Sequence, residues 1–149
     1  MKIFKHSFIV YSNIEKAWSF YTDIQHLKII TPQNMNLKII KTSKLTITQG
    51  QEDIIEGKII FLQRKWKSKI TYLRPYQYVD EMLNGPLKQW KHIHIFQKIN
   101  ENETNIVDEI EFELPFGILG KLFERYVYAR LTEIFEYRKI STKKNLESS

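Results

Sequence analysis

The feature that most constrains the fold is a two-residue hydrophobic repeat, clearest between Arg74 and Phe96 (RPYQYVDEMLNGPLKQWKHIHIF). Asn84-Gly85-Pro86 in its middle is a turn signal, so the segment predicts two antiparallel strands. Side chains at alternate positions share one face of a strand. That face carries Tyr78, Asp80 and Met82 on the first strand and Trp90, His92, His94 and Phe96 on the second. An aromatic surface that includes an acid and two histidines is typical of the wall of a ligand cavity.

The same repeat continues on both sides of this hairpin. It predicts strands at 2–11, 35–43, 52–62, 65–74, 76–84, 88–99 and 104–114, about seven in all. Two short helices are predicted after the first strand; the first buries Ile14, Ala17, Trp18 and Tyr21, and the second buries Ile24, Leu27 and Ile30. These elements predict an α+β domain built on a curved antiparallel sheet.

The predicted turns fix which residues lie opposite one another. Turns near Pro86 and Glu101 pair Asp80 with His92 and His94 with Asp108. A turn at Pro75 pairs Ile70 with Asp80 and Tyr72 with Tyr78, and a turn at Gln63-Arg64 pairs Phe61 with Trp66 and Ile59 with Ser68. The inner face then collects these apolar side chains: Ile59, Phe61, Trp66, Ile70, Tyr72, Tyr78, Trp90, Phe96, Ile110 and Phe112. Asp80, His92, His94 and Asp108 form a polar row across that face.

The chain after Pro115-Phe116-Gly117 predicts one long helix over residues 118–140. Its apolar face is predicted to hold Leu119, Phe123, Tyr126, Val127, Ile134 and Tyr137. Arg130 interrupts this face, where a guanidinium needs a negative partner. That partner is either Asp80 or Asp108 from the sheet, or an anionic group of a ligand. Residues 141–149 lack the periodicity and are predicted to form a flexible tail after a domain of residues 1–140.

The order of these elements and three segments of the chain resemble a known superfamily. The segments PYQYVDEMLNGPLKQWKHIHIF, IVDEIEFELPFGILGKLFERYV and LTEIFEYR are similar to those of bacterial single-domain proteins of the START-like helix-grip superfamily (SRPBCC). That superfamily includes Bet v 1-like plant proteins, lipid-transfer domains and polyketide cyclases/dehydrases. The resemblance implies a curved sheet that grips the long C-terminal helix, with an apolar cavity between them. It implies no particular reaction, because a fold does not fix a function.

Two interpretations of the polar row remain open. The Asp80–His92 and His94–Asp108 pairs can serve as acid/base pairs, since a carboxylate orients an imidazole and raises its pKa. Alternatively, each pair only satisfies its own hydrogen bonds inside a partly wet core. Alternate histidines on a strand can also bind a metal ion with one of the acids. The hydrogen-bonded row explains the same residues without an ion, so no metal and no other cofactor is expected.

Composition restricts the remaining classes of function. The chain has no Cys, so disulfides and thiol chemistry are excluded and a cytoplasmic location is expected. The net charge of +6 raises the question of nucleic acid. The charges follow the two-residue repeat and mark the outer faces of strands, with lysines at 65, 67 and 69 and glutamates at 109, 111 and 113. The sequence also has no nucleic-acid-binding motif. Nucleic acid is therefore not expected as a partner. No segment has the roughly 18 apolar residues of a membrane span. We expect a monomer or a weak homodimer.

The sequence therefore predicts a helix-grip domain that binds a small hydrophobic, lipid-like or amphipathic molecule between the sheet and the C-terminal helix. One alternative is a cyclase or dehydratase that uses a His–Asp pair in the same cavity, and another is a protein-interaction module without a ligand. The catalytic candidates are Asp80, His92, His94 and Asp108. The predicted ligand-binding residues are Trp66, Tyr72, Tyr78, Asp80, Trp90, His92, His94, Asp108, Phe112, Phe123, Tyr126 and Arg130.

Overall fold

The computed structural model of the chain describes residues 1–59 and 62–147, so the predicted inner-face residue Phe61 lies outside the described residues. Within these ranges the chain forms a seven-stranded antiparallel sheet in the order β1-β7-β6-β5-β4-β3-β2. The strands are β1 (Lys2–Val10), β2 (Lys38–Lys41), β3 (Glu52–Lys58), β4 (Gln63–Arg74), β5 (Gln77–Asn84), β6 (Gln89–Asn100) and β7 (Glu103–Glu113). The predicted α+β helix-grip architecture is confirmed.

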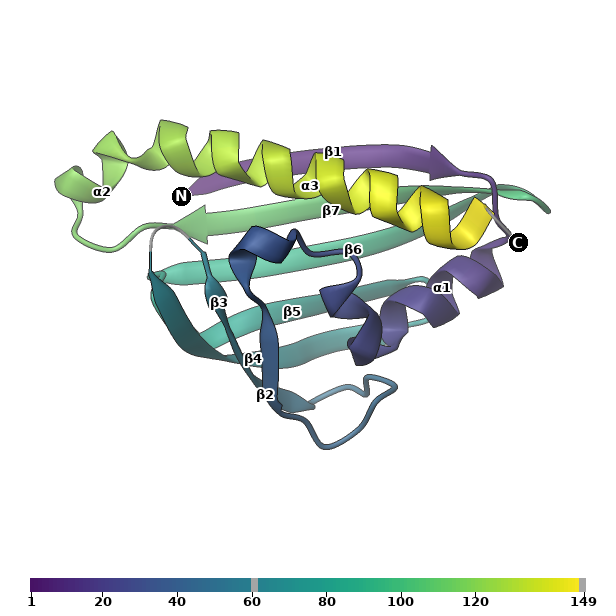
Figure 1. Ribbon diagram of the computed structural model, residues 1–149, viewed down its shortest axis with the longest axis horizontal. Helices are drawn as coiled ribbons and strands as arrows, with labels where there is room; N and C mark the ends of the chain where they lie inside the picture. Colours follow the sequence, from purple (N-terminus) through teal and green to yellow (C-terminus); the bar gives the residue numbers. More distant parts are fainter. Residues whose placement is uncertain (60–61, 148–149) are drawn as a thin grey trace.

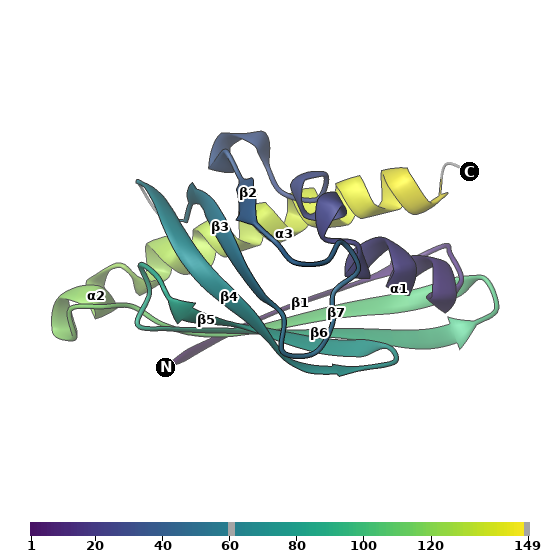
Figure 2. The same cartoon turned by 90° about the horizontal axis from the view of Figure 1, so that it is seen from below.

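The helices lie on one side of this sheet. α1 (Ile14–Thr22) and the 3-10 turns η1 (Ile24–Lys28) and η2 (Gln33–Met35) follow β1, and α2 (Ile118–Leu122) and α3 (Glu124–Glu147) end the chain. Figures 1 and 2 show α3 running across the side toward which the sheet bends, with α1 beside the C-terminal end of α3. Among the described residues, no helix combines the length and the apolarity that crossing a membrane requires.

The core forms because the strands alternate as the two-residue repeat predicts. β7 buries every second side chain from Thr104 to Phe112 and leaves the residues between them partly accessible. The buried apolar residues form two clusters. The first joins α1 to the sheet and includes Phe8, Val10, Ala17, Tyr21, Ile70, Tyr78 and Phe96. The second joins α3 to the sheet and includes Phe4, Ile110, Phe112, Val127, Leu131, Ile134 and Phe135.

The strand registers test the predicted turns one by one. Asp80 lies opposite His92 and His94 lies opposite Asp108, as predicted. Ile70 also lies opposite Asp80. The β3–β4 hairpin differs, because Ser68 pairs with Asp53 and not with Ile59. The turn at Gln63-Arg64 was predicted wrongly: both residues are part of β4, and Gln63 pairs with Lys58. Trp66 consequently lies opposite Ile55.

The C-terminal helix differs from the prediction at both ends. The chain breaks its helical course at Phe123, which separates α2 from α3. At the other end, α3 continues to Glu147 and buries Thr142 and Leu146. Residues 141–147 therefore belong to the packed helix, which corrects the predicted flexible tail from residue 141. The reason is that Thr142 and Leu146 continue the i, i+4 spacing of Ile134 and Arg138.

Candidate functional site

A cavity of ≈ 170 Å³ lies between α3, the sheet and the segment that follows α1. The sheet lines it from β3, β4, β5 and β6, and α3 lines the opposite side. The sheet contributes Asp53, Ile55, Trp66, Ser68, Ile70, Tyr78, Asp80, Met82, Trp90, His92 and His94. α3 contributes Val127, Arg130, Leu131, Ile134, Phe135 and Arg138. Most of the surface offered to a ligand is therefore apolar, and polar side chains come from both walls and from the segment that follows α1.

The turn that the sequence predicted at Asn84-Gly85-Pro86 packs against two residues of the cavity lining. A Cβ atom on Gly85 would lie 2.7 Å from Cβ of Trp66 and 2.5 Å from Sδ of Met82. Only glycine lets the turn approach these two lining residues so closely.

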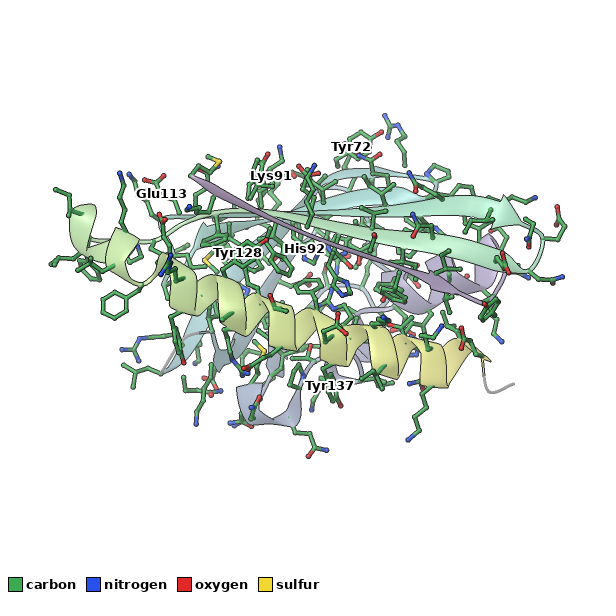
Figure 3. The ribbon with its side chains drawn as sticks, turned by 90° about the horizontal axis from the view of Figure 1, so that it is seen from above. Tyr72, Lys91, His92, Glu113, Tyr128 and Tyr137 are labelled. Atoms are coloured by element: carbon green, nitrogen blue, oxygen red, sulfur yellow. The ribbon has the colours of Figure 1, made fainter. Side chains whose placement is uncertain are left out.

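Seven of the predicted ligand-binding residues line this cavity: Trp66, Tyr78, Asp80, Trp90, His92, His94 and Arg130. Figure 3 shows His92 pointing from the sheet toward α3, whereas Tyr72 and Lys91 lie on the far side of the sheet. Tyr72 is 41% exposed, so its predicted place on the inner face is wrong. The cause is a register shift between Ile70 and Tyr72, which turns Tyr72 outward and pairs Leu73 with Tyr78.

Two further predicted residues are buried beside the cavity without being part of its described lining. Asp108 is fully buried behind the histidines, and Phe112 packs in the cluster between α3 and the sheet. Both residues lie on β7, and no described residue of β7 lines the cavity. Asp108 therefore acts on the cavity only through its neighbours.

The predicted face of the C-terminal helix is the least accurate part of the predicted site. Phe123 and Tyr126 are about half-exposed and do not line the cavity among the described residues. The residues that α3 buries are Val127, Leu131, Ile134, Phe135, Arg138, Thr142 and Leu146. Because the helix is interrupted at Phe123, α3 does not continue the rotation of α2. The face of α3 that packs on the sheet therefore differs from the face expected for one continuous helix from residue 118. Sequence reasoning consequently missed Leu131, Phe135 and Arg138.

The polar row forms two crossed pairs. Nε2 of His92 bonds Oδ1 of Asp108 at 2.7 Å, and Nε2 of His94 bonds Oδ2 of Asp80 at 2.6 Å. Each histidine thus bonds the acid diagonal to it and not the acid directly opposite, which corrects the predicted partners. The two imidazoles stack on each other with centroids 3.6 Å apart. The four side chains form one network, in which the stacked rings separate the two carboxylates.

This network shifts the pKa values of its members. Burial alone would raise the pKa of Asp108, but the hydrogen bond from His92 and the nearby charges of His92, Arg138 and His94 lower it to about 2. The pKa of Asp80 is lowered in the same way, against the effect of its burial, mainly by the hydrogen bond from His94. Burial and the charge of His92 lower the pKa of His94 to about 4, although Asp80 opposes this. Both acids are therefore ionised at neutral pH.

Two arginines of α3 line the cavity, and the sequence singled out only the first. Nη1 of Arg130 lies 3.1 Å from Glu133 and its Nη2 lies 2.9 Å from Asn34. The predicted pairing of Arg130 with Asp80 or Asp108 is therefore wrong. Arg138, two turns further along, is the arginine that faces Asp108, with Nη1 3.8 Å from Oδ1. The signal that could have found it is the i, i+4 spacing of Arg138 from Ile134 and Thr142.

Asp80, His92 and His94 could also hold a metal ion, since one ligand atom from each lies within 4.8 Å of the other two. A metal ion needs lone pairs that converge on one point. The two imidazoles are stacked 3.6 Å apart with planes inclined by only 27°, so their lone pairs lie in nearly parallel planes that do not meet at a nearby point. Both rings would have to turn, and the His94–Asp80 hydrogen bond would have to open, before an ion could bind. The observed arrangement favours hydrogen bonding.

No protein-family model matches the sequence, and no curated protein matches it either. Solved structures do match, over nearly the whole chain. A START superfamily protein from Mycobacterium smegmatis superposes with a TM-score of 0.76 at 11% identity, covering 97% of this chain and 97% of that one. The chain has the START-like helix-grip fold.

Two enzymes share this helix-grip fold. Norcoclaurine synthase from Thalictrum flavum, in complex with dopamine and hydroxybenzaldehyde, has a TM-score of 0.72 at 13% identity and covers 99% of this chain and 88% of its own. An aromatase/cyclase from Streptomyces has a TM-score of 0.69 at 15% identity and covers 97% of this chain and 90% of its own. At these identities the likeness is one of fold, so it confirms the resemblance that the sequence predicts and leaves the function to the site.

Proposed function

We propose that this protein binds one small hydrophobic or amphipathic molecule in the cavity between α3 and the sheet. The observation that carries this proposal is the cavity of ≈ 170 Å³, whose walls are mainly apolar and hold a few convergent polar groups. This combination is the usual composition of a small-molecule site. Binding would remove apolar ligand surface from water, at roughly 25 cal/mol per Å².

The volume of the cavity supports a ligand of limited size. An apolar cavity of about 150 Å³ holds one benzene molecule, whereas sites for drug-sized ligands measure roughly 300–1,000 Å³. A body of about one ring with a short substituent therefore suits this cavity better than a long lipid chain. Trp66 and Trp90 on the sheet and Leu131 and Ile134 on α3 would contact that body from opposite sides.

The enzyme alternative has less support from the polar groups. A general acid or base works best when its pKa lies near the working pH. The pKa of His94 is lowered to about 4 and that of Asp108 to about 2, so both are far from neutral pH. Each group is also bonded to a partner within the network. These properties support a binding role over a cyclase or dehydratase.

Isothermal titration calorimetry with toluene tests the proposal, because toluene has one ring and no polar group. We expect saturable binding of one molecule per chain, with a dissociation constant of roughly 10⁻⁴ M for so small a ligand. Leu131→Phe adds volume to the cavity wall and should abolish this binding. Ile140→Phe, on the exposed side of the same helix, is the matched control and should bind toluene as the wild type does. Equal binding by both variants, or no saturable binding by the wild type, would contradict the proposal.

A further inference from the structure

Arg138 is a buried polar side chain of the cavity with unsatisfied hydrogen-bond donors. Its side chain is only 8% exposed, and it lines the cavity. Among the described residues no hydrogen bond to it is formed, and its Nε atom is buried without a partner. Its closest opposite charge, Oδ1 of Asp108, lies 3.8 Å from Nη1, which is beyond hydrogen-bonding distance. The guanidinium also stacks over Phe135 at 4.7 Å.

A guanidinium in this position is unusual because it carries five N–H donors. Burying such donors without acceptors is unfavourable. Each neighbouring polar side chain has at least one hydrogen-bond partner: His92 has Asp108, His94 has Asp80, and Tyr21 has Thr142, although Nδ1 of His94 and Oδ2 of Asp108 have none in the described part of the chain. A shift of about 1 Å would let Arg138 bond Asp108 directly, but a carboxylate accepts at most two donors of the fork. Other donors would still lack an acceptor.

The charges around Arg138 indicate which kind of hydrogen-bond acceptor the cavity would take. The charge of Arg138 already acts on both acids, since it helps to lower the pKa of Asp80 and of Asp108. Its charge is therefore balanced while its hydrogen bonds are not. A second anion in the cavity would be repelled by Asp80, whose side chain lines it. A neutral oxygen acceptor satisfies the donors without adding charge.

We propose that the cavity is selective for neutral carbonyl compounds of about one ring, whose carbonyl oxygen accepts hydrogen bonds from Arg138. The apolar body of such a ligand lies between the tryptophans of the sheet and the aliphatic side chains of α3. This inference rests on the proposed binding function and adds the class of ligand. It also replaces Arg130, which already has two partners, as the residue that orients the ligand.

Three isosteric probes test the inference by calorimetry on the full-length protein. Acetophenone has the carbonyl oxygen, α-methylstyrene replaces that oxygen by a methylene group, and benzoate carries a negative charge. We expect the wild type to bind acetophenone about tenfold more tightly than α-methylstyrene, the difference that one hydrogen bond from a charged donor makes. Benzoate should bind more weakly than acetophenone because Asp80 repels it.

Variants then assign this preference to Arg138. Arg138→Met should reduce the ratio of the affinities for acetophenone and α-methylstyrene to about one. Toluene should still bind, since methionine preserves most of the side-chain volume. Arg138→Lys keeps the charge and loses the fork, so the preference should fall to an intermediate value. Arg125→Met, on an exposed position of the same helix, is the matched control and should keep the wild-type ratio.

The outcomes separate this inference from the proposed function. Equal affinity of the wild type for acetophenone and α-methylstyrene would overturn the carbonyl inference and leave a cavity that binds apolar molecules. Tightest binding of benzoate would overturn it in favour of an anionic ligand. An Arg138→Met variant that folds and keeps the tenfold preference would also overturn it. Failure of every probe to bind would overturn the proposed function with it. Should Arg138→Met not fold, the wild-type ratio and Arg138→Lys still decide.

Discussion

The two walls of the cavity differ in how their polar groups are satisfied. On the sheet, His92 and His94 each form a short hydrogen bond to an acid, and the two rings stack on each other. On the helix, Arg138 is equally buried but has no hydrogen bond within the described residues. Across residues 1–59 and 62–147, each side chain of the sheet network therefore has at least one hydrogen bond without a ligand, although Nδ1 of His94 and Oδ2 of Asp108 lack a partner, whereas Arg138 on the helix has none.

This difference indicates which wall stabilises the fold and which wall recognises a ligand. A buried pair that is hydrogen-bonded on both sides is strongly destabilised when one member is removed. A buried donor without an acceptor contributes little to stability, yet it can contribute to ligand binding. The following predictions test this division, beginning with the largest expected effect.

Asp108→Ala should be the most damaging single change in the sheet wall. It removes the acceptor of His92 and the nearest negative charge to Arg138, so we expect the free energy of unfolding to fall by about 3–5 kcal/mol. Chemical denaturation measures this. Glu109→Ala, the next residue on β7, removes only a surface ion pair with Lys5 and should cost less than about 1 kcal/mol. Similar losses for both variants would show that the buried network is not stabilising.

Leu146→Ala tests the far end of the helix wall. Leu146 is 4% exposed and packs in the cluster around α1, so its truncation should cost about 2–3 kcal/mol. Ile140→Ala, at an exposed position on the same helix, should change the free energy of unfolding by less than about 0.5 kcal/mol. If Leu146→Ala proved as mild as Ile140→Ala in thermal or chemical denaturation, residues 141–147 would be a flexible tail after all.

Arg138→Met should cost less stability than Asp108→Ala, about 1 kcal/mol, because it removes a buried cation that forms no hydrogen bond and fills the space with an apolar chain. A double-mutant cycle with Asp108→Ala should give a measurable coupling for Arg138 and none above about 0.5 kcal/mol for Arg130. Denaturation curves of the single and double variants provide both values. Equal coupling of Arg130 and Arg138 to Asp108 would contradict the assignment of Arg138 as the arginine that interacts with Asp108.

Tyr72→Ala should have the smallest effect. Tyr72 lies on the outer face of the sheet, so we expect a change below about 1 kcal/mol in stability and unchanged toluene binding. Tyr78→Ala is the inward counterpart, since Tyr78 is buried and lines the cavity. It should lower both the stability and the affinity for toluene. A loss of toluene binding in Tyr72→Ala would place the ligand on the other face of the sheet.

The sheet wall could be predicted from the sequence because its period is two and its turns carry signals. Glycine and proline mark the turn between β5 and β6, so the pairing of Asp80 with His92 followed from counting. No such signal marks the β3–β4 hairpin, where the pairing of Trp66 was predicted wrongly. A slip by an even number of residues leaves the same side chains inward, so the hydrophobic pattern alone cannot detect it.

The helix wall was harder to predict because a period of 3.6 magnifies small errors of phase. The break at Phe123 and aromatic residues on several sides of α3 hid the face that packs. An error of one residue turns a helix by about 100°, which is enough to exchange Arg138 for Arg130 as the buried cation. The crossed His–Asp hydrogen bonds could not be predicted from the sequence either. Strand register determines which side chains are neighbours, but the side-chain rotamers determine which of these neighbours form a hydrogen bond.

Intermolecular nuclear Overhauser effects between bound acetophenone and labelled methyl groups test directly whether the ligand lies between the two walls. Ile70 on β4 and Leu131 and Ile134 on α3 line the cavity from opposite walls. We expect the ring protons to contact methyl groups of both walls at once in the wild type, and Leu131→Phe to remove all these contacts. Contacts confined to exposed methyl groups such as those of Ile118 and Leu119 on α2 would contradict it, because the ligand would then lie outside the space between the two walls.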